Sequence, residues 1–188
     1  MGFTVIVEGN FGFGFADTRL PTKRGGKAVF AFLSLLSGYC NLDDNEDTTD
    51  LEREWHKWFK HLQTYIEQPL SAVFEPIMDC MWGDGGGIGG DFYEDEYQWY
   101  LKRTGEWNGK MTEAEFRQFI QASNLCWSPI DAVMANVKLL IDVFKTKELD
   151  DIEALYIAQD TIPDFESLYD TLAILKHFRY ANVRLNFS

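Results

Sequence analysis

Four oxygen-bearing side chains lie in a short acidic stretch with the spacing of a calcium-binding loop. Asp43, Asn45, Asp47 and Glu54 match the first, third, fifth and twelfth positions of an EF-hand loop. Carboxylate and amide oxygens are the ligands that Ca²⁺ prefers. The sixth position is Thr48, however, where the sharp turn of that loop requires glycine, and the next residue begins a helix-capping signal. We therefore interpret the stretch as an acidic loop that caps a helix, and a metal site made of these four residues is the alternative.

A second stretch combines glycines with carboxylates. The sequence WGDGGGIGGD, residues 82–91, matches both the GGxGxD repeat of calcium-binding β-helices and the GxGxxG pattern of dinucleotide-binding turns. One copy cannot form a β-helix turn, which needs neighbouring repeats, and the acidic residues that follow would repel a phosphate. We interpret the stretch as a surface loop that becomes ordered when it binds a partner.

The glycines run directly into an acidic and aromatic segment, DFYEDEYQWY, residues 91–100. Paired carboxylates beside aromatic rings can form a sugar site, in which the carboxylates supply acid and base and the rings stack on the sugar. Exposed Tyr and Trp beside charged residues are also typical of the most important contacts in protein interfaces. We favour the interface and expect its contacts to come from Asp84, Asp91, Tyr93, Glu94, Asp95, Glu96, Tyr97 and Trp99.

The cysteines and histidines form no motif for catalysis or metal binding. Cys40, Cys80 and Cys126 lie far apart, and an odd number of cysteines argues against a disulfide framework and for a reducing compartment. His56 and His61 are five positions apart, so they do not share a helix face as a zinc-binding i, i+4 pair would. We expect no catalytic residue and no cofactor.

The charge of the chain limits its partners. The formal net charge is −13, which opposes binding to nucleic acids or to anionic lipid and leaves a cationic protein as an allowed partner. Positive charge gathers at Arg19, Lys23, Arg24 and Lys27, where it could neutralise one of the acidic loops. The first residues contain no basic segment followed by a long apolar run, so we expect neither a signal peptide nor a membrane anchor, and a cytoplasmic location.

The helices that position these segments are predicted from apolar spacing and capping signals. Residues 27–36, KAVFAFLSLL, are apolar on almost every side and predict a central buried helix. A capping box at Thr49 begins a helix that ends before Pro69 and whose apolar stripe includes Tyr65, and another at Thr112 begins a short one. Further amphipathic helices are expected after Ser128 and from Pro163 onward, with apolar stripes that face the core and that extend to Phe178 in the second of them.

The strands are predicted from alternation and turn signals. Residues 3–8 and 11–16 would form a hairpin around Gly9 and Asn10. Residues 152–158 favour a buried strand, although periodicity alone does not separate this from a helix, and residues 181–187 alternate as a half-buried strand. A helix between these last two would give a right-handed crossover and parallel pairing. We predict one α+β domain over residues 1–188, with a small mixed sheet of the N-terminal hairpin and C-terminal strand packed against four to six helices.

The C-terminal half carries a resemblance to a known class. The run Leu155-Tyr156-Ile157-Ala158, the helix start Asp164-Phe165-x-x-Leu168 and the closing strand 183–187 resemble small α+β immunity proteins of bacterial polymorphic-toxin systems. The resemblance lies in pattern and element order, over the last third of the chain with the opening strand and helix. It implies a stoichiometric inhibitor that binds a cognate toxin and performs no chemistry. An acidic surface would speed its encounter with a basic toxin domain.

Our prediction is therefore an acidic, cytoplasmic, non-enzymatic protein-binding module, most concretely an immunity protein. Two alternatives remain at this point. One is a metal-dependent or carbohydrate-acting enzyme that uses the acidic loops, and the other is a structural protein that associates with itself through aromatic side chains.

Overall fold

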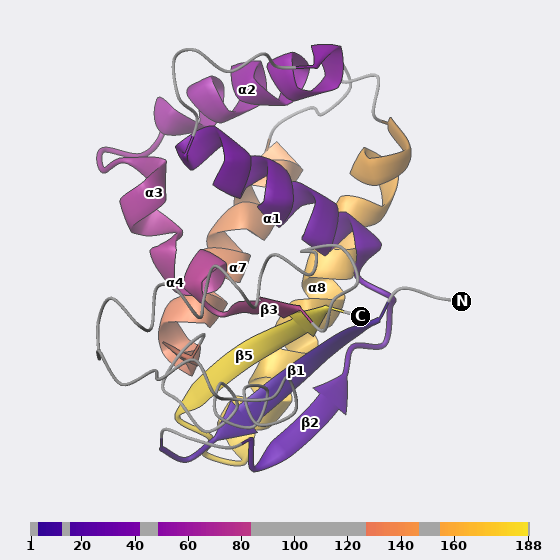
Figure 1. The fold of residues 1–188 in the computed structure, drawn as a ribbon, viewed down its shortest axis with the longest axis vertical. Coiled ribbons are helices and arrows are strands. Elements are labelled where there is room, and N and C mark those ends of the chain that lie inside the picture. Colours follow the sequence, from indigo (N-terminus) through magenta and orange to yellow (C-terminus); the bar gives the residue numbers. More distant parts are fainter. Residues whose placement is uncertain (1–3, 13–15, 42–48, 84–126, 147–154, 188) are drawn as a thin grey trace, which may run out of the picture.

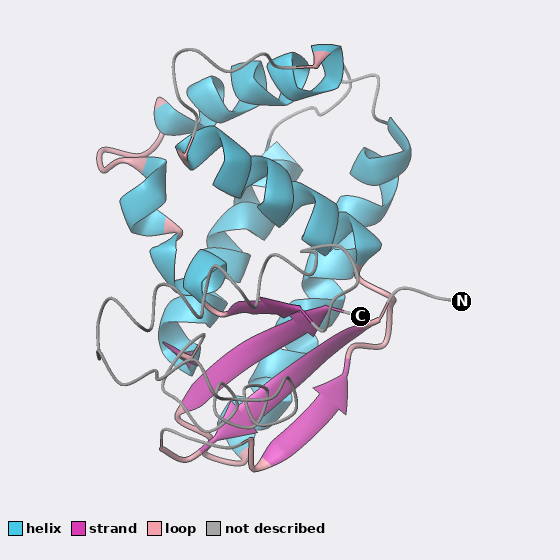
Figure 2. Cartoon of the chain, in the orientation of Figure 1, coloured by secondary structure: helices cyan, strands magenta, loops and turns pink. Residues whose placement is uncertain are grey.

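A computed structural model describes residues 4–12, 16–41, 49–83, 127–146 and 155–187. It contains a mixed sheet with the strand order β2-β1-β5-β3, and a further strand, β4, pairs with β5. The strands are β1 (Val5–Asn10), β2 (Thr18–Pro21), β3 (Met81–Gly83), β4 (Ser128–Pro129) and β5 (Asn182–Phe187). The predicted α+β class, with a small mixed sheet and surrounding helices, is confirmed (Figures 1 and 2).

The described helices are α1 (Lys27–Cys40), α2 (Asp50–Gln63), α3 (Leu70–Val73), α4 (Glu75–Asp79), α7 (Ile130–Thr146) and α8 (Leu155–His177). In Figure 1, α7 and α8 lie behind the sheet, while α1 and α2 lie above it. Pairing within the sheet joins the first and last described strands, because β1 is antiparallel to both β2 and β5. The two ends of the chain thus build the centre of one sheet.

The predicted central helix is confirmed in α1. Ala28, Val29, Phe32, Leu33 and Leu36 are buried, and the remaining apolar residues of the helix are half-buried. The Phe32 ring is the centre of an aromatic cluster, with ring centroids 5.0 to 5.7 Å from five other rings, those of Trp55, Trp58, Phe59, Phe144 and Phe165. Edge-to-face packing of this kind stabilises a core beyond the area that it buries.

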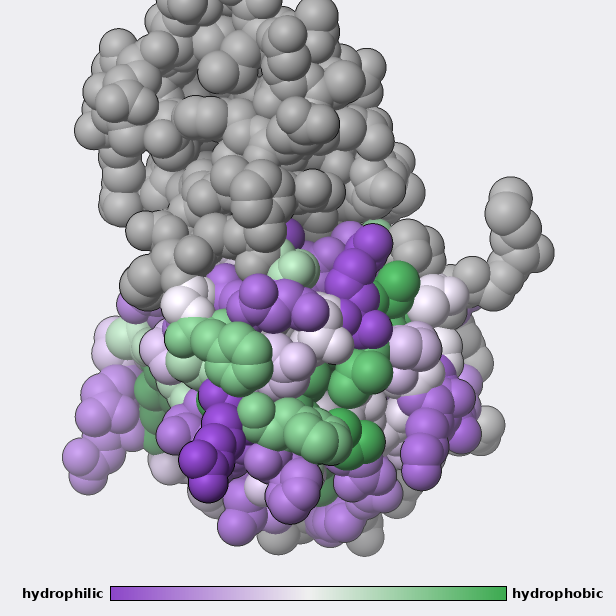
Figure 3. All heavy atoms as spheres, turned by 90° about the horizontal axis from the view of Figure 1, so that it is seen from below, coloured by the Kyte–Doolittle hydropathy of each residue, from purple (hydrophilic) through white to green (hydrophobic). Residues whose placement is uncertain are grey.

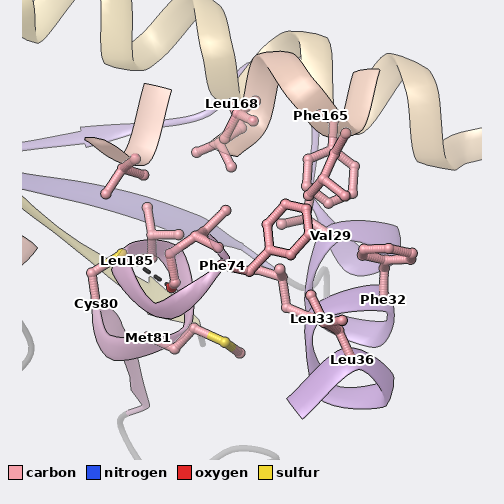
Figure 4. Packing of buried hydrophobic residues seen from close by; sticks show 14 of the residues in the cluster. Val29, Phe32, Leu33, Leu36, Phe74, Cys80, Met81, Phe165, Leu168 and Leu185 are labelled. Atoms are coloured by element: carbon pink, nitrogen blue, oxygen red, sulfur yellow. Dashed lines mark hydrogen bonds between the residues drawn. The ribbon is translucent and has the colours of Figure 1, made fainter. Parts of the chain in front are cut away.

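The rest of the core joins α1 to the sheet. In Figure 4, side chains of α1, of the α3 and α4 segment, of α8 and of β5 meet, among them Val29, Phe74, Leu168 and Leu185. The Leu185 N–H also donates to the Cys80 carbonyl at 2.7 Å. Burial of α1 and α8 against each other and the sheet accounts for the apolar stripes that the sequence shows.

The capping box at Thr49 is confirmed. The Glu52 N–H donates to Thr49 Oγ1 at 3.2 Å, and the Thr49 N–H donates to Glu52 Oε2 at 2.9 Å. In the apolar stripe of α2, Trp55, Trp58, Phe59 and Leu62 are buried as predicted, whereas Tyr65 lies beyond the helix end and is 65% exposed. Local signals therefore placed this helix correctly, although its stripe was extended too far.

The predicted hairpin has the right first arm and the wrong turn. Gly9 and Asn10 belong to β1, which continues to Asn10, and the arm that pairs with it is β2 rather than residues 11–16. Asn10 continues the strand because it lies opposite Asn182 in the central pairing of the sheet. This long-range pairing prevails over the local preference of Gly-Asn for a turn.

The strand predicted at residues 152–158 is also wrong over Leu155–Ala158, the residues of that stretch that the structure describes. Leu155–Ala158 form the start of α8, and Pro163 lies inside that helix rather than at its first turn. A short apolar run is compatible with either structure, and packing of α8 on α1 and α7 decides for helix. The predicted crossover fails with it, and the parallel neighbour of β5 is β3 instead.

The closing strand is buried on both faces instead of one. All six residues of β5 are buried, including the polar Asn182, Arg184 and Asn186. The alternation predicted the two faces correctly, since Val183, Leu185 and Phe187 belong to the hydrophobic core. The polar face is covered as well, and its charges therefore need partners.

Candidate functional site

The residues predicted to contact a partner lie outside the described residues. This holds for all eight of them, Asp84, Asp91, Tyr93, Glu94, Asp95, Glu96, Tyr97 and Trp99, and for Asp43, Asn45, Asp47 and the helix predicted after Thr112. The fourth residue of the suggested calcium loop, Glu54, is half-buried in α2. The calcium loop and the partner-binding segment therefore both remain predictions.

A carboxylate between two guanidinium groups lies on the polar face of the sheet. Glu8 of β1 is directly opposite Arg184 of β5, and Arg184 Nε donates to Glu8 Oε2 at 2.7 Å. The other carboxylate oxygen, Oε1, is 3.0 Å from Nε of Arg19 in β2. Both oxygens of Glu8 are thus held by cations of the chain, which leaves this carboxylate unsuited to transferring a proton to a substrate.

The buried end of this cluster is closed by an indole ring. The Arg184 guanidinium carbon lies 4.3 Å from the centroid of the Trp127 ring. Arg184 is only 1% exposed, whereas the Arg19 side chain is 57% exposed. The arrangement is an ion pair stabilised by a cation–π contact, and it fixes the pairing of the two central strands.

A second charged cluster lies where α1 begins. Arg24 Nε donates to Asp164 Oδ1 at 2.6 Å, and the Ala28 N–H donates to Asp164 Oδ2 at 3.2 Å. Arg24 also contacts Asp160 at 3.0 Å, and the hydrogen bond to Asp164 is the main cause that raises the pKa of its guanidinium. Asp164 of α8 therefore caps α1, whose preceding residue, Gly26, has φ 72° and offers no side chain.

A pocket of about 360 Å³ lies beside this cap, lined by residues 24–27 together with Asp160 and Asp164. Helix N-termini attract anions, but here the carboxylate of Asp164 already occupies that position. Among the described residues, two of the four basic residues, Arg19 and Arg24, thus pair with acidic residues of β1 and α8. This cluster joins α1 to α8, and both of its carboxylates are engaged by the Arg24 guanidinium.

The described cysteines are poor nucleophiles. Burial raises the pKa of the Cys80 thiol far above its usual range, and Cys80 Sγ donates to the Ile77 carbonyl. Burial also raises the pKa of Cys40. A thiol that keeps its proton reacts slowly. Among the residues that the structure places, no group of three or more His, Cys, Asp or Glu side chains is arranged to hold a metal ion.

The largest exposed apolar side chains include three at one end of the molecule. Phe11 is 60% exposed, Phe178 is 62% exposed and Ile174 is 44% exposed. The Phe11 ring, just beyond β1, stacks on the Tyr180 ring with centroids 4.4 Å apart, and Tyr180 follows the end of α8. We call Phe11, Ile174, Phe178, Arg179 and Tyr180 the end surface. Figure 3 views this end and shows green apolar side chains gathered between purple polar ones.

The end surface is built on an unusual helix cap. The Tyr180 N–H donates to the Leu175 carbonyl at 3.2 Å and the Arg179 N–H to the Lys176 carbonyl at 2.9 Å, which is the Schellman pattern. Arg179 occupies the left-handed position with φ 68°, where glycine is the usual residue. An arginine there costs about 1 kcal/mol relative to glycine.

The sequence interpretation missed this surface. The stripe from Pro163 assigned Phe178 to the core, but α8 ends at His177 and Phe178 lies outside it. A usable signal was present, because Lys-His-Phe-Arg-Tyr at residues 176–180 has the basic residues of a helix end but no glycine to cap it. An aromatic residue that follows the last residue of a helix no longer belongs to the apolar stripe of that helix.

Comparison of the chain with protein-family models, with curated proteins and with solved structures found no match in any of the three. No helix in the described part of the chain is both long and apolar enough to cross a membrane.

Proposed function

We propose that this chain is an acidic protein-binding module with no catalytic activity of its own. The observation that carries the proposal is the end surface, where Phe11 and Phe178 are each at least 60% exposed. Exposed aromatic side chains that gather at one place are typical of protein interfaces. The charged clusters at Glu8 and at Asp164, by contrast, are engaged in contacts that hold the fold together.

The most concrete form of the proposal is an immunity protein that neutralises a cognate bacterial toxin in the cytoplasm. A net charge of −13 would attract a basic toxin domain over several ångströms beyond contact and would increase the association rate. The acidic and aromatic residues 84–99 are the expected electrostatic contact, and the end surface adds apolar contacts. Inhibition by occupying the toxin requires no chemistry from this chain.

The test is co-expression of the full chain with the protein encoded beside its gene. We expect growth to be restored in cells that express that protein, and a one-to-one complex in size-exclusion chromatography with light scattering. Because charge steers the encounter, the association rate should fall as salt is raised from 50 to 500 mM, roughly in line with screening at a Debye length of about 8 Å near physiological salt. No protection and no complex with that neighbour would contradict the immunity function.

A thermal melt with metal separates the proposal from an enzyme built on the acidic loops. A cation that binds only the folded state must raise the melting temperature as its concentration rises. Titration of the full chain with Ca²⁺ or Mn²⁺ to millimolar concentrations should leave the midpoint unchanged. A rise that follows metal concentration, and that is lost in Asp47→Asn, would favour the metal-dependent alternative.

A further inference from the structure

The end surface presents apolar side chains from two separate parts of the chain. Ile174 and Phe178 are four residues apart at the end of α8, and Phe11 comes from the turn after β1. The stacked Tyr180 ring links the two parts. Tyr180 is itself fixed against the sheet, because a side chain at Gly9 would lie 3.2 Å from its ring. The exposed Phe11 ring is therefore held against the sheet through Tyr180.

Arg179 lies in the middle of these residues at a cost to the fold. Both hydrogen bonds of the helix cap are made by backbone groups, so the cap does not use the arginine side chain. Glycine would serve the same backbone better, since φ is 68°. Arg179 is exposed, and it makes no ion pair with the other described residues. Neither the backbone of the cap nor an ion pair with the described residues therefore accounts for a guanidinium at this position.

Two acidic groups in contact with this part of the chain are already engaged. Asp131 pairs with Lys176 at 2.6 Å, and Asp17 accepts the Phe11 N–H at 3.0 Å. At physiological salt, charges more than about 8 Å from Arg179 are largely screened, so contact at this position is governed mainly by the charge of Arg179 itself. A carboxylate is the group that a guanidinium binds best in a protein partner.

We propose that the end surface binds a segment of a partner protein that carries apolar side chains and a carboxylate. Phe11, Ile174 and Phe178 contact the apolar side chains, and Arg179 pairs with the carboxylate. This inference rests on the proposed protein-binding function and adds a specific contact to it. A partner whose surface is basic as a whole can still carry such a segment, because a short segment can contain a carboxylate whatever the net charge of the protein.

The test uses a phage-displayed library of random 12-residue peptides, selected on the full chain. We expect the enriched peptides to combine aromatic or aliphatic residues with Asp or Glu. Binding of the synthetic peptides should weaken by about tenfold or more in Phe178→Ala and in Arg179→Gly, as expected for truncation of central contacts. Tyr65→Ala is the matched control, since Tyr65 is equally exposed but lies beyond α2, and it should leave binding unchanged.

Arg179→Gly separates binding from folding. This variant should be more stable than the wild type and yet bind less well, whereas a structural role would lower both together. Arg179→Lys keeps the charge and the strained backbone, and it should retain part of the affinity. The inference is wrong if no peptide is enriched, if the enriched peptides are basic, or if their binding is equal in wild type, Phe178→Ala and Arg179→Gly.

Other molecules that could cover the end surface would give different results. A dimer in sedimentation velocity that dissociates in Phe178→Ala would assign the surface to a second copy of the chain and overturn the proposal. If the protein encoded beside the gene binds the wild type and both variants equally, this inference fails while the proposed function stands. If that protein does not bind but the peptides do, the immunity function fails and the end surface stands.

Discussion

Removing the carboxylate of Glu8 should be among the most destabilising single changes in the described part of the chain. Its Oε2 accepts from Arg184 Nε at 2.7 Å, and Arg184 is 1% exposed. In Glu8→Leu the guanidinium stays buried between the strands and loses this charged partner. Breaking a buried ion pair on one side typically costs about 3–5 kcal/mol of unfolding free energy.

Two side chains beside the Glu8–Arg184 pair affect how much unfolding free energy is lost. The Trp127 ring at 4.3 Å remains in place and continues to stabilise the cation, by up to about 2 kcal/mol when water is excluded. Arg19 loses its contact with Glu8 too, but its side chain is 57% exposed and regains water. We therefore expect the lower part of the range, about 3 kcal/mol.

The double variant Glu8→Leu with Arg184→Met tests the cause. Replacing both partners by apolar side chains removes the buried charge altogether, so stability should return to within about 1 kcal/mol of the wild type or exceed it. Arg19→Ala is the control on the exposed side of the same carboxylate, and it should cost less than about 1 kcal/mol. Urea denaturation of the full chain at pH 7, followed by tryptophan fluorescence and circular dichroism, measures all three.

Either of two results would refute the stabilising role assigned to Glu8. One is a loss below about 1 kcal/mol in Glu8→Leu, which would mean that water or another group replaces the carboxylate. The other is a double variant that is less stable than either single variant. This would mean that the ion pair stabilises the fold more than the apolar side chains that replace it. An unchanged slope of free energy against urea is needed for the comparison, because it shows that the unfolded states match.

Three further changes follow from the described contacts. Arg179→Gly should raise the free energy of unfolding in urea by about 1 kcal/mol, because it relieves the left-handed backbone; a loss of stability would mean that the arginine side chain supports the cap. Thr49→Ala should lower it by about 1 kcal/mol, because α2 loses its capping box, and circular dichroism during the same titration would show whether the helix is affected. Burial raises the pKa of the Cys80 thiol, so the folded state keeps a proton that the unfolded state loses above about pH 8.5. Between pH 8.5 and 9.5 stability should therefore fall as pH rises, approaching about 1.4 kcal/mol per pH unit, and Cys80→Ala should reduce that slope; an equal slope in both proteins would count against it.

Elements with a local signal were predicted well. The Thr49 capping box depends on groups three residues apart, and the structure contains both of its hydrogen bonds. The α1 segment was recognised because its apolar residues leave only a narrow polar edge, and Phe32 is indeed central to the aromatic core. Signals of this kind depend on neighbours along the chain, so the sequence contains nearly all of the information.

The errors arose where distant residues decide the structure. Leu155–Ala158 are helical because α8 packs along α1 and α7, and Asn10 stays in a strand because Asn182 lies opposite it. No local pattern reveals either neighbour. The same holds for Arg184, whose place in an alternating strand suggested contact with solvent, although it is buried against Glu8 and Trp127. A polar residue on a strand is exposed only if nothing covers that face.

The end surface shows how a site can escape prediction even when its elements are expected. A helix from Pro163 through Phe178 would place Phe178 on the buried stripe, but the helix ends one residue earlier. That single residue moves the ring from core to surface, because the Schellman turn at Arg179 reverses the chain. Periodicity assigns a residue to a face of a helix, whereas only the position of the cap decides whether that residue still belongs to the helix. The backbone turn of the cap is thus the cause of the exposed ring, and the arginine in a position that favours glycine is the feature that distinguishes this surface from an accidental apolar patch.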